Sequence, residues 1–555
     1  MKRFIFIISL IIPYCLCAQI SIDWQQCYGS MGNDEACGII DNGNGYLLAG
    51  YVAEKNGMVS CESLWGKDWL IEITRNGDLV EEHCYDSIAI GEHGGIFKGK
   101  ANGFYSVGVA PSEYGKNQIN ITRFDSDGNE MWRKSFGNRN SSFWLSPKGA
   151  ATADGGVIAN INTQWAGGDI SSYYGMDDAW VVKVDSLGNL EWETTLGTEG
   201  LENAGGITLA SDGGYYVSMC GRPGYNGSIS VCMPPTTDEY DGFFVKLDGD
   251  GNVLWNRCYA GSKDDEIYQA LELEDGFLLL CDTQSEDRDA EGAGYHFGYL
   301  NGQSWYRQTL DIWLIKTDFE GNIIWSKCYG GTADEFPLKA FQNEDGGFTV
   351  FGTTKSLDGD VVSTHNLQYN NEHMQSKIWV FRTDDQGNLI WERAIGTQKR
   401  APETVADVIK HNDKEYTIAA TAYPNHFEMT GDYYCSNDTI IPYSNENFWV
   451  LHITDIFNYD DPTGIEEQPK VVSLQMKVHP NPATTWVAVD YTLPTDNAKA
   501  ELSVFNAMGV KVKQVELNGN QGQKVLDLRG LADGVYICTV LCGEYCQTQK
   551  IVITK

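Results

Sequence analysis

Acidic side chains recur at one position of a repeated sequence unit, just before a predicted inner strand. The members are Asp34-Glu35, Glu202, Asp264-Asp265-Glu266, Asp334-Glu335 and Glu403. A ring of carboxylates at the mouth of a central channel would bind a cation or a polyol, and a close pair could cleave a glycosidic bond. A recurring carboxylate can also serve the fold, because it accepts hydrogen bonds from nearby backbone amides. The sequence leaves both roles open.

Aromatic residues of the long insertions are the second set of candidates. A flat ring on a surface loop stacks on a sugar face or packs against a protein partner. The same rings can instead pack the loops against one another. We predict ligand contacts for Trp65, Trp165, Tyr225, Tyr295, Trp305, Tyr369, Tyr433 and Tyr434, with Tyr173 and Tyr174 in the same class.

Motifs for nucleophilic or nucleotide chemistry are missing from the sequence, which has no Gly-x-Ser-x-Gly elbow and no phosphate-binding loop. Its histidines show no zinc spacing, although His365 and His373 share one insertion with Asp358 and Asp360. The turn Asp248–Asn252 imitates a calcium loop but lacks the glutamate that would complete it. We therefore expect no catalytic residue and no cofactor, with calcium as the one ion that the acidic loops could hold.

Tryptophan marks the repeat that must position these residues. Each unit alternates short β-rich runs with Asp-Gly-Gly and Asp-x-x-Gly-Asn turns, where glycine supplies the positive φ of tight hairpins. No stretch has a sustained helical period. Four strands in each of seven units predict an all-β, seven-bladed β-propeller over residues 19–456. The closing residue falls on the outer strand, where its ring can pack between neighbouring units; it is Trp24, Trp132, Trp192, Trp255, Trp325 and Trp391.

The seventh unit begins after Trp391 but has no outer strand of its own. The missing strand stands at the front of the chain, in Ile20–Tyr28. We predict that it pairs with the strand Phe448–Thr454 and so closes the ring. The repeat resembles that of the tryptophan-docked propellers of the quinoprotein-dehydrogenase and outer-membrane assembly type, whose units also end in Asp-x-x-x-Gly followed by Trp. The resemblance implies architecture and no activity.

Long insertions separate the second and third strands of a unit, for example at 282–310, 353–377 and 423–447. In a propeller they leave on the same face as the connections between units, whereas the short turns form the opposite face. Binding residues concentrate on loops that a rigid scaffold holds. We therefore expect ligand binding on the face of the insertions, the insertion face.

The charge balance excludes two classes of partner. The chain has 40 Lys and Arg against 76 Asp and Glu, a net charge of −36, whereas nucleic acid and anionic lipid both require a basic surface. Residues 1–18 predict a signal peptide, because Lys2 and Arg3 precede the apolar run Phe4–Ile12 and small Ala18 follows. That run is too short to cross a membrane, so we expect an exported protein without a transmembrane span.

Cysteine positions follow the repeat. Four cysteines fall three residues after the closing-tryptophan position, and equivalent positions in different blades are too far apart to bond. We predict buried thiols there and at two strand ends; these residues are Cys27, Cys84, Cys258, Cys328, Cys220 and Cys281. The predicted disulfide candidates are Cys61, Cys232, Cys435, Cys538, Cys542 and Cys546.

A polar linker at 457–470 leads into a separate β-rich unit, residues 471–555. Its landmarks are Pro480-Asn481-Pro482, Gly509, Gly534, Tyr536 and the final Lys555. This combination resembles the C-terminal sorting domain of the type IX (Por) secretion system of Bacteroidota. The resemblance implies a small β-sandwich, export by that machinery, removal of the domain by a sortase-like peptidase, and a protein attached to the cell surface or released.

These features favour a secreted or cell-surface propeller that binds a protein or glycan through its insertion face without catalysis. One alternative is a secreted glycan-active enzyme that uses carboxylates at the channel mouth. Another is a structural envelope component with no specific ligand. Close carboxylates with separated pKa values would favour the enzyme, and an exposed aromatic patch would favour the binding protein.

Overall fold

The computed structural model divides into two compact units, Met1–Phe457 and Asn458–Lys555. Its described residues contain one short 3-10 turn, η2 (Arg288–Ala290), and no α-helix; every other element is a β-strand. The structure describes residues 20–554 apart from 31, 61–66, 86–93, 100–102, 112–116, 138–147, 223, 231–238, 302–305, 364–375, 397–402, 423–445, 457–474, 494–499, 507–510, 518–520 and 543–544.

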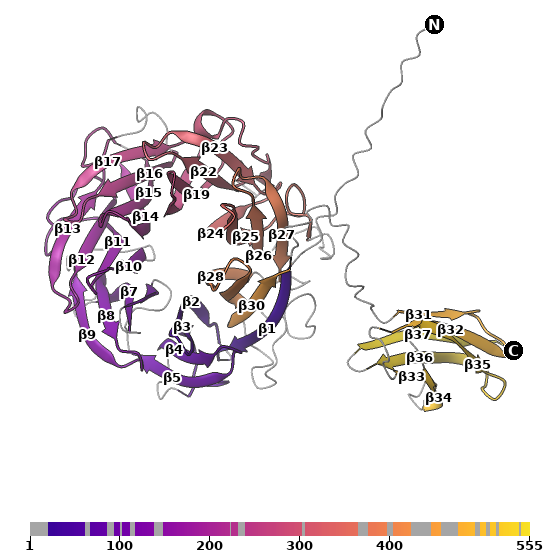
Figure 1. Cartoon of the computed structure of the whole chain (residues 1–555). Helices are drawn as coiled ribbons and strands as arrows, with labels where there is room; N and C mark the ends of the chain where they lie inside the picture. Colours follow the sequence, from indigo (N-terminus) through magenta and orange to yellow (C-terminus); the bar gives the residue numbers. More distant parts are fainter. Residues whose placement is uncertain are drawn as a thin grey trace, which may run out of the picture. The chain divides into compact units, whose positions relative to one another are not determined.

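Seven four-stranded antiparallel sheets surround a central opening in the first unit (Figure 1). Sheet 1 is β2 (Glu35–Asp41), β3 (Gly45–Val52), β4 (Lys67–Thr74) and β5 (Leu79–Tyr85); sheet 2 is β6 (Gly94–Lys98), β7 (Phe104–Pro111), β8 (Asn117–Phe124) and β9 (Glu130–Phe136). Sheet 3 is β10 (Lys148–Ala151), β11 (Val157–Thr163), β12 (Asp178–Val184) and β13 (Leu190–Leu196); sheet 4 is β14 (Leu201–Leu209), β15 (Tyr215–Arg222), β16 (Asp241–Leu247) and β17 (Val253–Tyr259).

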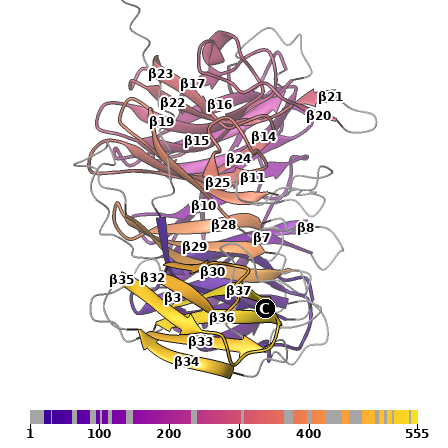
Figure 2. The same cartoon turned by 90° about the vertical axis from the view of Figure 1, so that its right-hand side faces the viewer.

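The other three sheets continue the same pattern. Sheet 5 is β18 (Asp265–Glu272), β19 (Phe277–Thr283), β22 (Asp311–Thr317) and β23 (Ile323–Tyr329), and its insertion holds the hairpin of β20 (Tyr299–Asn301) and β21 (Tyr306–Gln308), which projects from one side of the ring in Figure 2. Sheet 6 is β24 (Glu335–Gln342), β25 (Phe348–Thr354), β26 (Lys377–Thr383) and β27 (Leu389–Ile395); sheet 7 is β28 (Glu403–Lys410), β29 (Glu415–Ala422), β30 (Asn447–Asp455) and β1 (Ile20–Tyr28).

The first strand of each sheet lies nearest the central opening. These inner strands contact one another in the order β2, β6, β10, β14, β18, β24 and β28, and β28 in turn contacts β2. At the outside of sheet 7, β1 pairs with β30, with Tyr28 opposite Phe448 and Cys27 opposite Trp449. The indole nitrogen of Trp449 donates to Gln25 at 3.0 Å. The N-terminal strand therefore lies in one sheet with the last three strands of the unit.

Outer-strand tryptophans join each sheet to the next one. Trp192 on β13 donates its indole N–H to the carbonyl of Gly249, in the hairpin between β16 and β17, at 3.1 Å. A Cβ on Gly251 of that hairpin would lie 2.4 Å from the Trp192 ring, and Gly251 has φ +82°. Glycine is thus required twice, by the turn and by the ring above it. Trp132 and Trp325 make the same contact with the hairpins at Ser186 and Asp385.

The most deeply buried tryptophans, however, lie on third strands and not on outer strands. Trp192 keeps part of its surface in solvent. The fully buried third-strand tryptophans are Trp69, Trp180, Trp313, Trp379 and Trp449. Third strands lie between two others and have their neighbouring sheets on both faces, so both faces of the strand are apolar. The hydrophobic core of the ring therefore lies between adjacent sheets.

The second unit packs two sheets around one hydrophobic core. The three-stranded sheet holds β31 (Gln475–His479), β32 (Trp486–Thr492) and β35 (Gln521–Asp527). The four-stranded sheet has the order β34 (Lys511–Leu517), β33 (Ala500–Asn506), β36 (Gly534–Cys542) and β37 (Tyr545–Ile553). Inward residues alternate along β32 and β36, as in a sandwich of antiparallel sheets.

Candidate functional site

Insertions and inter-sheet connections meet on one face of the ring. The N–H of Glu202, at the start of β14, donates to the carbonyl of Asp177, which ends the insertion of the preceding sheet, at 2.7 Å. Asp265 bonds Tyr240 in the same way at 2.8 Å. Each inner strand thus begins beside the insertion of its neighbour. The two kinds of loop share the insertion face, as the sequence predicts.

Most of the recurring carboxylates hold the connections between sheets. Four of them accept a hydrogen bond from the backbone N–H four residues earlier in the chain, and all four are fully buried. Hydroxyl groups occupy further positions on the same carboxylates, for example Thr354 on Glu335 at 2.6 Å. The pairs are Ser30 with Asp34, Thr198 with Glu202, Gly261 with Asp265 and Gly331 with Glu335. These groups are structural and do not form an open ring of ligands.

Burial nevertheless makes these carboxyl groups weak acids. Loss of hydration raises the pKa of Asp34 to about 6, of Glu202 and Asp265 to about 7 and of Glu335 to about 8, although the hydrogen bonds that they accept act in the opposite direction. Their charge therefore changes within the physiological pH range.

Glu266 and Asp282 form a different arrangement on sheet 5. They are directly opposite each other in the register of β18 and β19, a placement that is unfavourable for two negative charges. The hydroxyl of Tyr268, the residue at the β-bulge of β18, donates to Asp282 at 3.0 Å and lies 3.4 Å from Glu266. Burial raises the pKa of both carboxyl groups, and each raises that of the other or is raised by Asp264. Proton sharing is therefore expected within this pair.

Access limits what this pair can do. Asp282 is 1 % exposed, and the neighbouring Cys220 thiol of sheet 4 is buried, with its pKa raised first by burial and then by Glu266 and Asp282. A buried carboxyl group cannot contact the anomeric carbon of a sugar, and a thiol with a raised pKa is a poor nucleophile. The pair has the pKa signature of a functional site without an open approach for a polymer.

Glutamates on outer strands anchor the insertions to the ring. The Glu193 carboxylate accepts hydrogen bonds from the indole N–H of Trp180 at 2.7 Å and from the backbone N–H of Ser171, in the insertion of sheet 3, at 3.3 Å. Glu392 does the same for Trp379 and Ser363. The sequence signal for these anchors is an acid directly after the closing tryptophan, and it was not among the predicted functional positions. The insertions are therefore rigid where they leave the sheets.

Exposed apolar side chains gather where the insertions of sheets 3 and 4 meet. Trp165 is 56 %, Met176 67 % and Tyr225 71 % exposed, and Tyr174 is also exposed. They lie around the connection Glu199–Gly200. These four side chains are called the apolar cluster.

Backbone hydrogen bonds place the apolar cluster. Met176 N–H donates to Gly200 at 2.7 Å, and Glu199 N–H donates to Asn226, next to Tyr225, at 2.8 Å. The Gln164 side chain donates to the Asp177 carboxylate, which places Trp165 beside the same connection. The cluster therefore spans two sheets on a fixed backbone, and Met176 is a member that the sequence did not indicate.

The remaining aromatic candidates separate into two groups. Tyr295 is partly buried, packs against the core of sheet 5 and donates its hydroxyl to the Thr309 carbonyl at 2.6 Å. Tyr173 donates to the Met176 carbonyl at 2.9 Å and so supports the cluster. Outside the described residues lie Trp65, Trp305, Tyr369, Tyr433 and Tyr434.

The structure corrects several cysteine predictions. Cys27, Cys84 and Cys258 are disulfide-bonded and are not buried thiols. The prediction compared repeat-equivalent positions only, which are indeed too distant, and did not consider a cysteine elsewhere in the chain as partner. Since three is odd and the other described cysteines are free, at least one partner lies outside the described residues. Buried free thiols are present at Cys220, Cys281 and Cys328, as predicted, and at Cys538, which was predicted as a disulfide candidate.

Metal and membrane features are sparse. Among the described residues, no three His, Cys, Asp or Glu side chains are grouped to hold a metal ion. In the turn that imitates a calcium loop, the Asp248 carboxylate accepts the N–H groups of Asp250 and Asn252, both at 2.9 Å, and so serves the hairpin. His365 and His373 lie outside the described residues. Within the same part of the chain, no helix has the length and hydropathy needed to span a bilayer.

The landmarks of the C-terminal unit connect its first turn to its last strand. Asn481 donates to the Lys550 carbonyl at 2.6 Å and accepts from the N–H of Val552 at 2.9 Å. Tyr536 is buried and donates to Ala532 at 3.0 Å, and Gly534 has φ +153° at the start of β36. Pro480 and Pro482 flank Asn481 in this turn, whereas Gly509 and Lys555 lie outside the described residues.

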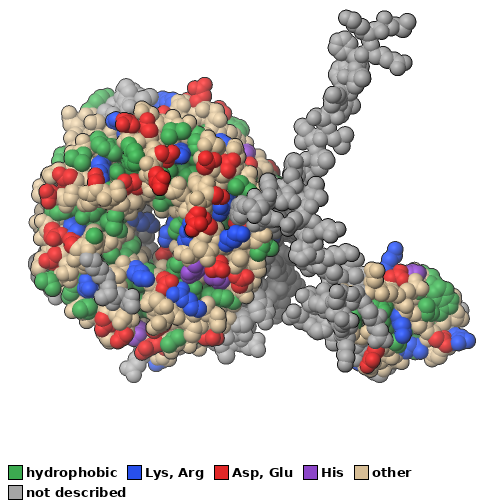
Figure 3. All heavy atoms as spheres, in the orientation of Figure 1, with side chains coloured by type: hydrophobic (Ala, Val, Ile, Leu, Met, Phe, Trp, Pro, Cys, Tyr) green, Lys and Arg blue, Asp and Glu red, His purple; other side chains and the backbone are tan. Residues whose placement is uncertain are grey.

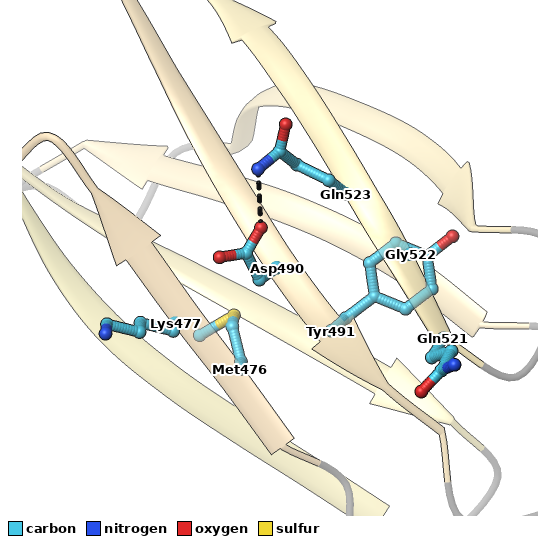
Figure 4. Close-up of a pocket in the computed structure, with 7 residues that line it drawn as sticks. All are labelled: Met476, Lys477, Asp490, Tyr491, Gln521, Gly522 and Gln523. Atoms are coloured by element: carbon cyan, nitrogen blue, oxygen red, sulfur yellow. Dashed lines mark hydrogen bonds between the residues drawn. The ribbon is translucent and has the colours of Figure 1, made fainter.

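A pocket of about 570 Å³ opens on the three-stranded sheet of this unit (Figure 4). Asp490 accepts a hydrogen bond from Gln523 at 2.7 Å, and His479 lies 2.7 Å from its other oxygen. The Tyr491 hydroxyl would lie 2.8 Å from a Cβ on Gly522, so only glycine fits beneath this ring. The pocket belongs to the C-terminal unit and not to the predicted insertion face.

Comparison with protein families identifies this C-terminal unit. Residues 477–554 match the secretion system C-terminal sorting domain. The protein is therefore directed by type IX secretion to the cell surface or the surrounding medium. No curated protein shows significant sequence similarity to the chain.

Solved structures similar to the chain share little sequence with it. The α-L-arabinofuranosidase Arb93A of Fusarium graminearum has 8 % identity and a TM-score of 0.36 over 61 % of this chain and 94 % of its own. The phage phi92 endosialidase has 9 % identity and a TM-score of 0.32 over 96 % and 87 %. A glycoside hydrolase of family 32 from Bifidobacterium adolescentis has 10 % identity and a TM-score of 0.25 over 96 % and 95 %. At these values the likeness carries no conclusion about activity.

Proposed function

We propose that the first unit is a closed seven-bladed propeller, completed by β1, that binds a protein or glycan through its insertion face without catalysis. The observation that carries this proposal is the apolar cluster of Trp165, Tyr174, Met176 and Tyr225 on a hydrogen-bonded backbone. Exposed aromatic and thioether groups lose hydration on contact and stack on sugar or protein surfaces. The anchored insertions hold the cluster in place, so little conformational entropy is lost on binding.

Neighbouring charges restrict the ligand. Asp177 and Glu199 lie beside the cluster, and the chain carries a net charge of −36. Repulsion disfavours a polyanionic partner. A neutral glycan or a protein surface without excess negative charge fits this site best.

Binding is tested with the full chain on glycan and protein arrays. Trp165→Ala and Tyr225→Ala should each weaken binding of a hit several-fold, since a stacking contact contributes about 1 kcal/mol beyond its buried area. Leu187→Ala is the matched control, because Leu187 is 68 % exposed in the turn at the opposite end of β12. A hit that ignores both aromatic changes and responds to the Leu187 change would place the working face on the other side.

A second candidate, a glycan-active enzyme, draws support from the opposed Glu266 and Asp282. It predicts turnover of a glycan hit that Glu266→Gln or Asp282→Asn abolishes. Binding without turnover, unchanged in both variants, would leave the binding function alone.

The C-terminal unit supports two further proposals. We infer that the type IX machinery and its sortase-like peptidase are partners, and that the unit is removed at export. Detection of the mature protein without residues 471–555 at the cell surface would support removal, and a surface protein that retains them would contradict it.

A further inference from the structure

Two lysines and one aspartate face one another across the central channel. Lys148 lies on β10, Lys339 on β24 and Asp407 on β28. In the ring of inner strands, two others separate β10 from β24 and two separate it from β28. Asp407 and Lys339 nevertheless both influence the pKa of Lys148. The three side chains therefore reach toward one another through the channel, and Figure 3 shows Lys and Arg side chains at the central opening.

Close packing of the inner strands makes this reach possible. A Cβ on Gly206 of β14 would lie 2.3 Å from the Tyr268 carbonyl of β18, and one on Gly149 of β10 would lie 3.2 Å from the Phe97 ring of β6. Glycine thus permits neighbouring inner strands to approach closely. The resulting channel is narrow enough for groups on distant sheets to interact.

Asp407 shows how the channel holds a carboxylate. It accepts from the Lys339 ammonium at 2.6 Å, from the Val408 N–H at 2.8 Å and from the Ile39 N–H at 3.4 Å. Lys339 also donates to the Val408 carbonyl at 2.9 Å, which leaves one of its three N–H bonds available. Lysine ammonium and backbone N–H groups from two sheets therefore converge on a carboxylate.

Lys148 is the cation left over. Its side chain is exposed to solvent, and no ion pair or hydrogen bond joins it to another described residue. Surrounding protein reduces the hydration of its ammonium and lowers its pKa, with Lys339 acting in the same direction and Asp407 in the opposite one. An ammonium that has lost hydration without gaining a partner binds an anion readily.

We propose that the channel binds a small carboxylate-bearing molecule between Lys148 and Lys339. The three charged groups sum to +1, so a monoanion neutralises them, whereas a phosphate dianion would add a negative charge beside Asp407. The carboxylate can come from a sugar acid or from the C-terminus of a peptide. The site is separate from the apolar cluster.

The test uses the full chain with ¹³C-dimethylated lysines, so that each amine gives an NMR signal. Acetate, glucuronate and an acetylated dipeptide are the carboxylate probes, and inorganic phosphate is the competitor. We expect the Lys148 signal to shift with carboxylate and its pKa to rise on binding, since the anion favours the charged amine. Glucuronate binding more tightly than acetate would identify a sugar acid, and the dipeptide a chain terminus.

Variants separate the site from nonspecific binding. Lys148→Met should weaken carboxylate binding about tenfold, as for loss of one charge-assisted hydrogen bond. Lys134→Met, on the outer strand β9, is the matched control and should leave binding unchanged. Lys148→Met removes a poorly hydrated charge, so the variant should remain folded, and Lys148→Arg should retain binding. Equal affinity in wild type and Lys148→Met, or phosphate binding as tightly as carboxylate, would overturn the proposal.

Discussion

The indole N–H of Trp180 donates a 2.7 Å hydrogen bond to the Glu193 carboxylate, whose other oxygen holds the insertion of sheet 3 at Ser171. One glutamate thus links a buried core residue to a surface loop. The core of each such sheet and the base of its insertion are therefore coupled.

Replacement of Trp180 and Trp192 should separate core from surface tryptophans. Trp180→Ala removes a fully buried side chain and should cost about 3–5 kcal/mol of unfolding free energy. Trp192→Ala removes a half-buried ring and should cost about 1–2 kcal/mol. Denaturant unfolding of the full chain, followed by tryptophan fluorescence, measures both. Equal costs would contradict the placement of the core on third strands.

Glu193→Ala should destabilise by about 1–3 kcal/mol, because the buried indole N–H of Trp180 loses its acceptor. It should also release the insertion at Ser171, so hydrogen exchange should increase there. Glu191→Ala is a control on the same strand, since Glu191 bonds Lys183 at the other end of the sheet. If exchange at Ser171 rose equally in both variants, Glu193 would not be the anchor.

Stability should fall as the pH rises from about 5 to 9. The folded-state pKa of Glu335 is about 8 and that of Glu202 about 7, both above the model value of 4.5. Their contribution is therefore fully present below pH 4.5 and is lost as the pH passes through the folded-state values. Glu335→Gln cannot titrate, so its melting temperature should depend less on pH over this range. Parallel curves for wild type and variant would contradict a raised pKa at Glu335.

Alkylation should distinguish the two classes of cysteine. Cys27, Cys84 and Cys258 should resist a thiol reagent in the unfolded, non-reduced protein, because they are disulfide-bonded. Cys281 and Cys328 should react after unfolding but not before it, because burial raises the pKa of each thiol. Mass spectrometry of digests before and after reduction measures this. Labelling of Cys27 without reductant would be the contrary result.

Deletion of residues 471–555 should separate folding from export. The two units form largely separate sets of contacts, and each has its own hydrophobic clusters. We expect the truncated protein to fold and remain in the periplasm, as measured by cell fractionation and circular dichroism. A truncated protein at the cell surface would show that another signal suffices.

Local turn chemistry was readable from the sequence. Asp248 and Gly251 specify their hairpin because the carboxylate accepts backbone N–H groups within the turn and glycine supplies the positive φ. These requirements involve only neighbouring residues. The Pro480–Pro482 turn and Tyr536 likewise indicated the sorting domain that the family comparison identifies.

Relationships between distant residues appeared only with the tertiary structure. Glu266 and Asp282 are opposite each other because of the register and bulge of β18 and β19, and Lys148 meets the field of Asp407 because their strands face each other across the channel. Sequence periodicity assigns a side chain to a face of its strand, but sheet register and the arrangement of sheets decide which charges meet. The sequence therefore determined the strands, the turns and the sorting domain, and the three-dimensional packing decided which carboxylates are structural and which amine is left without a partner.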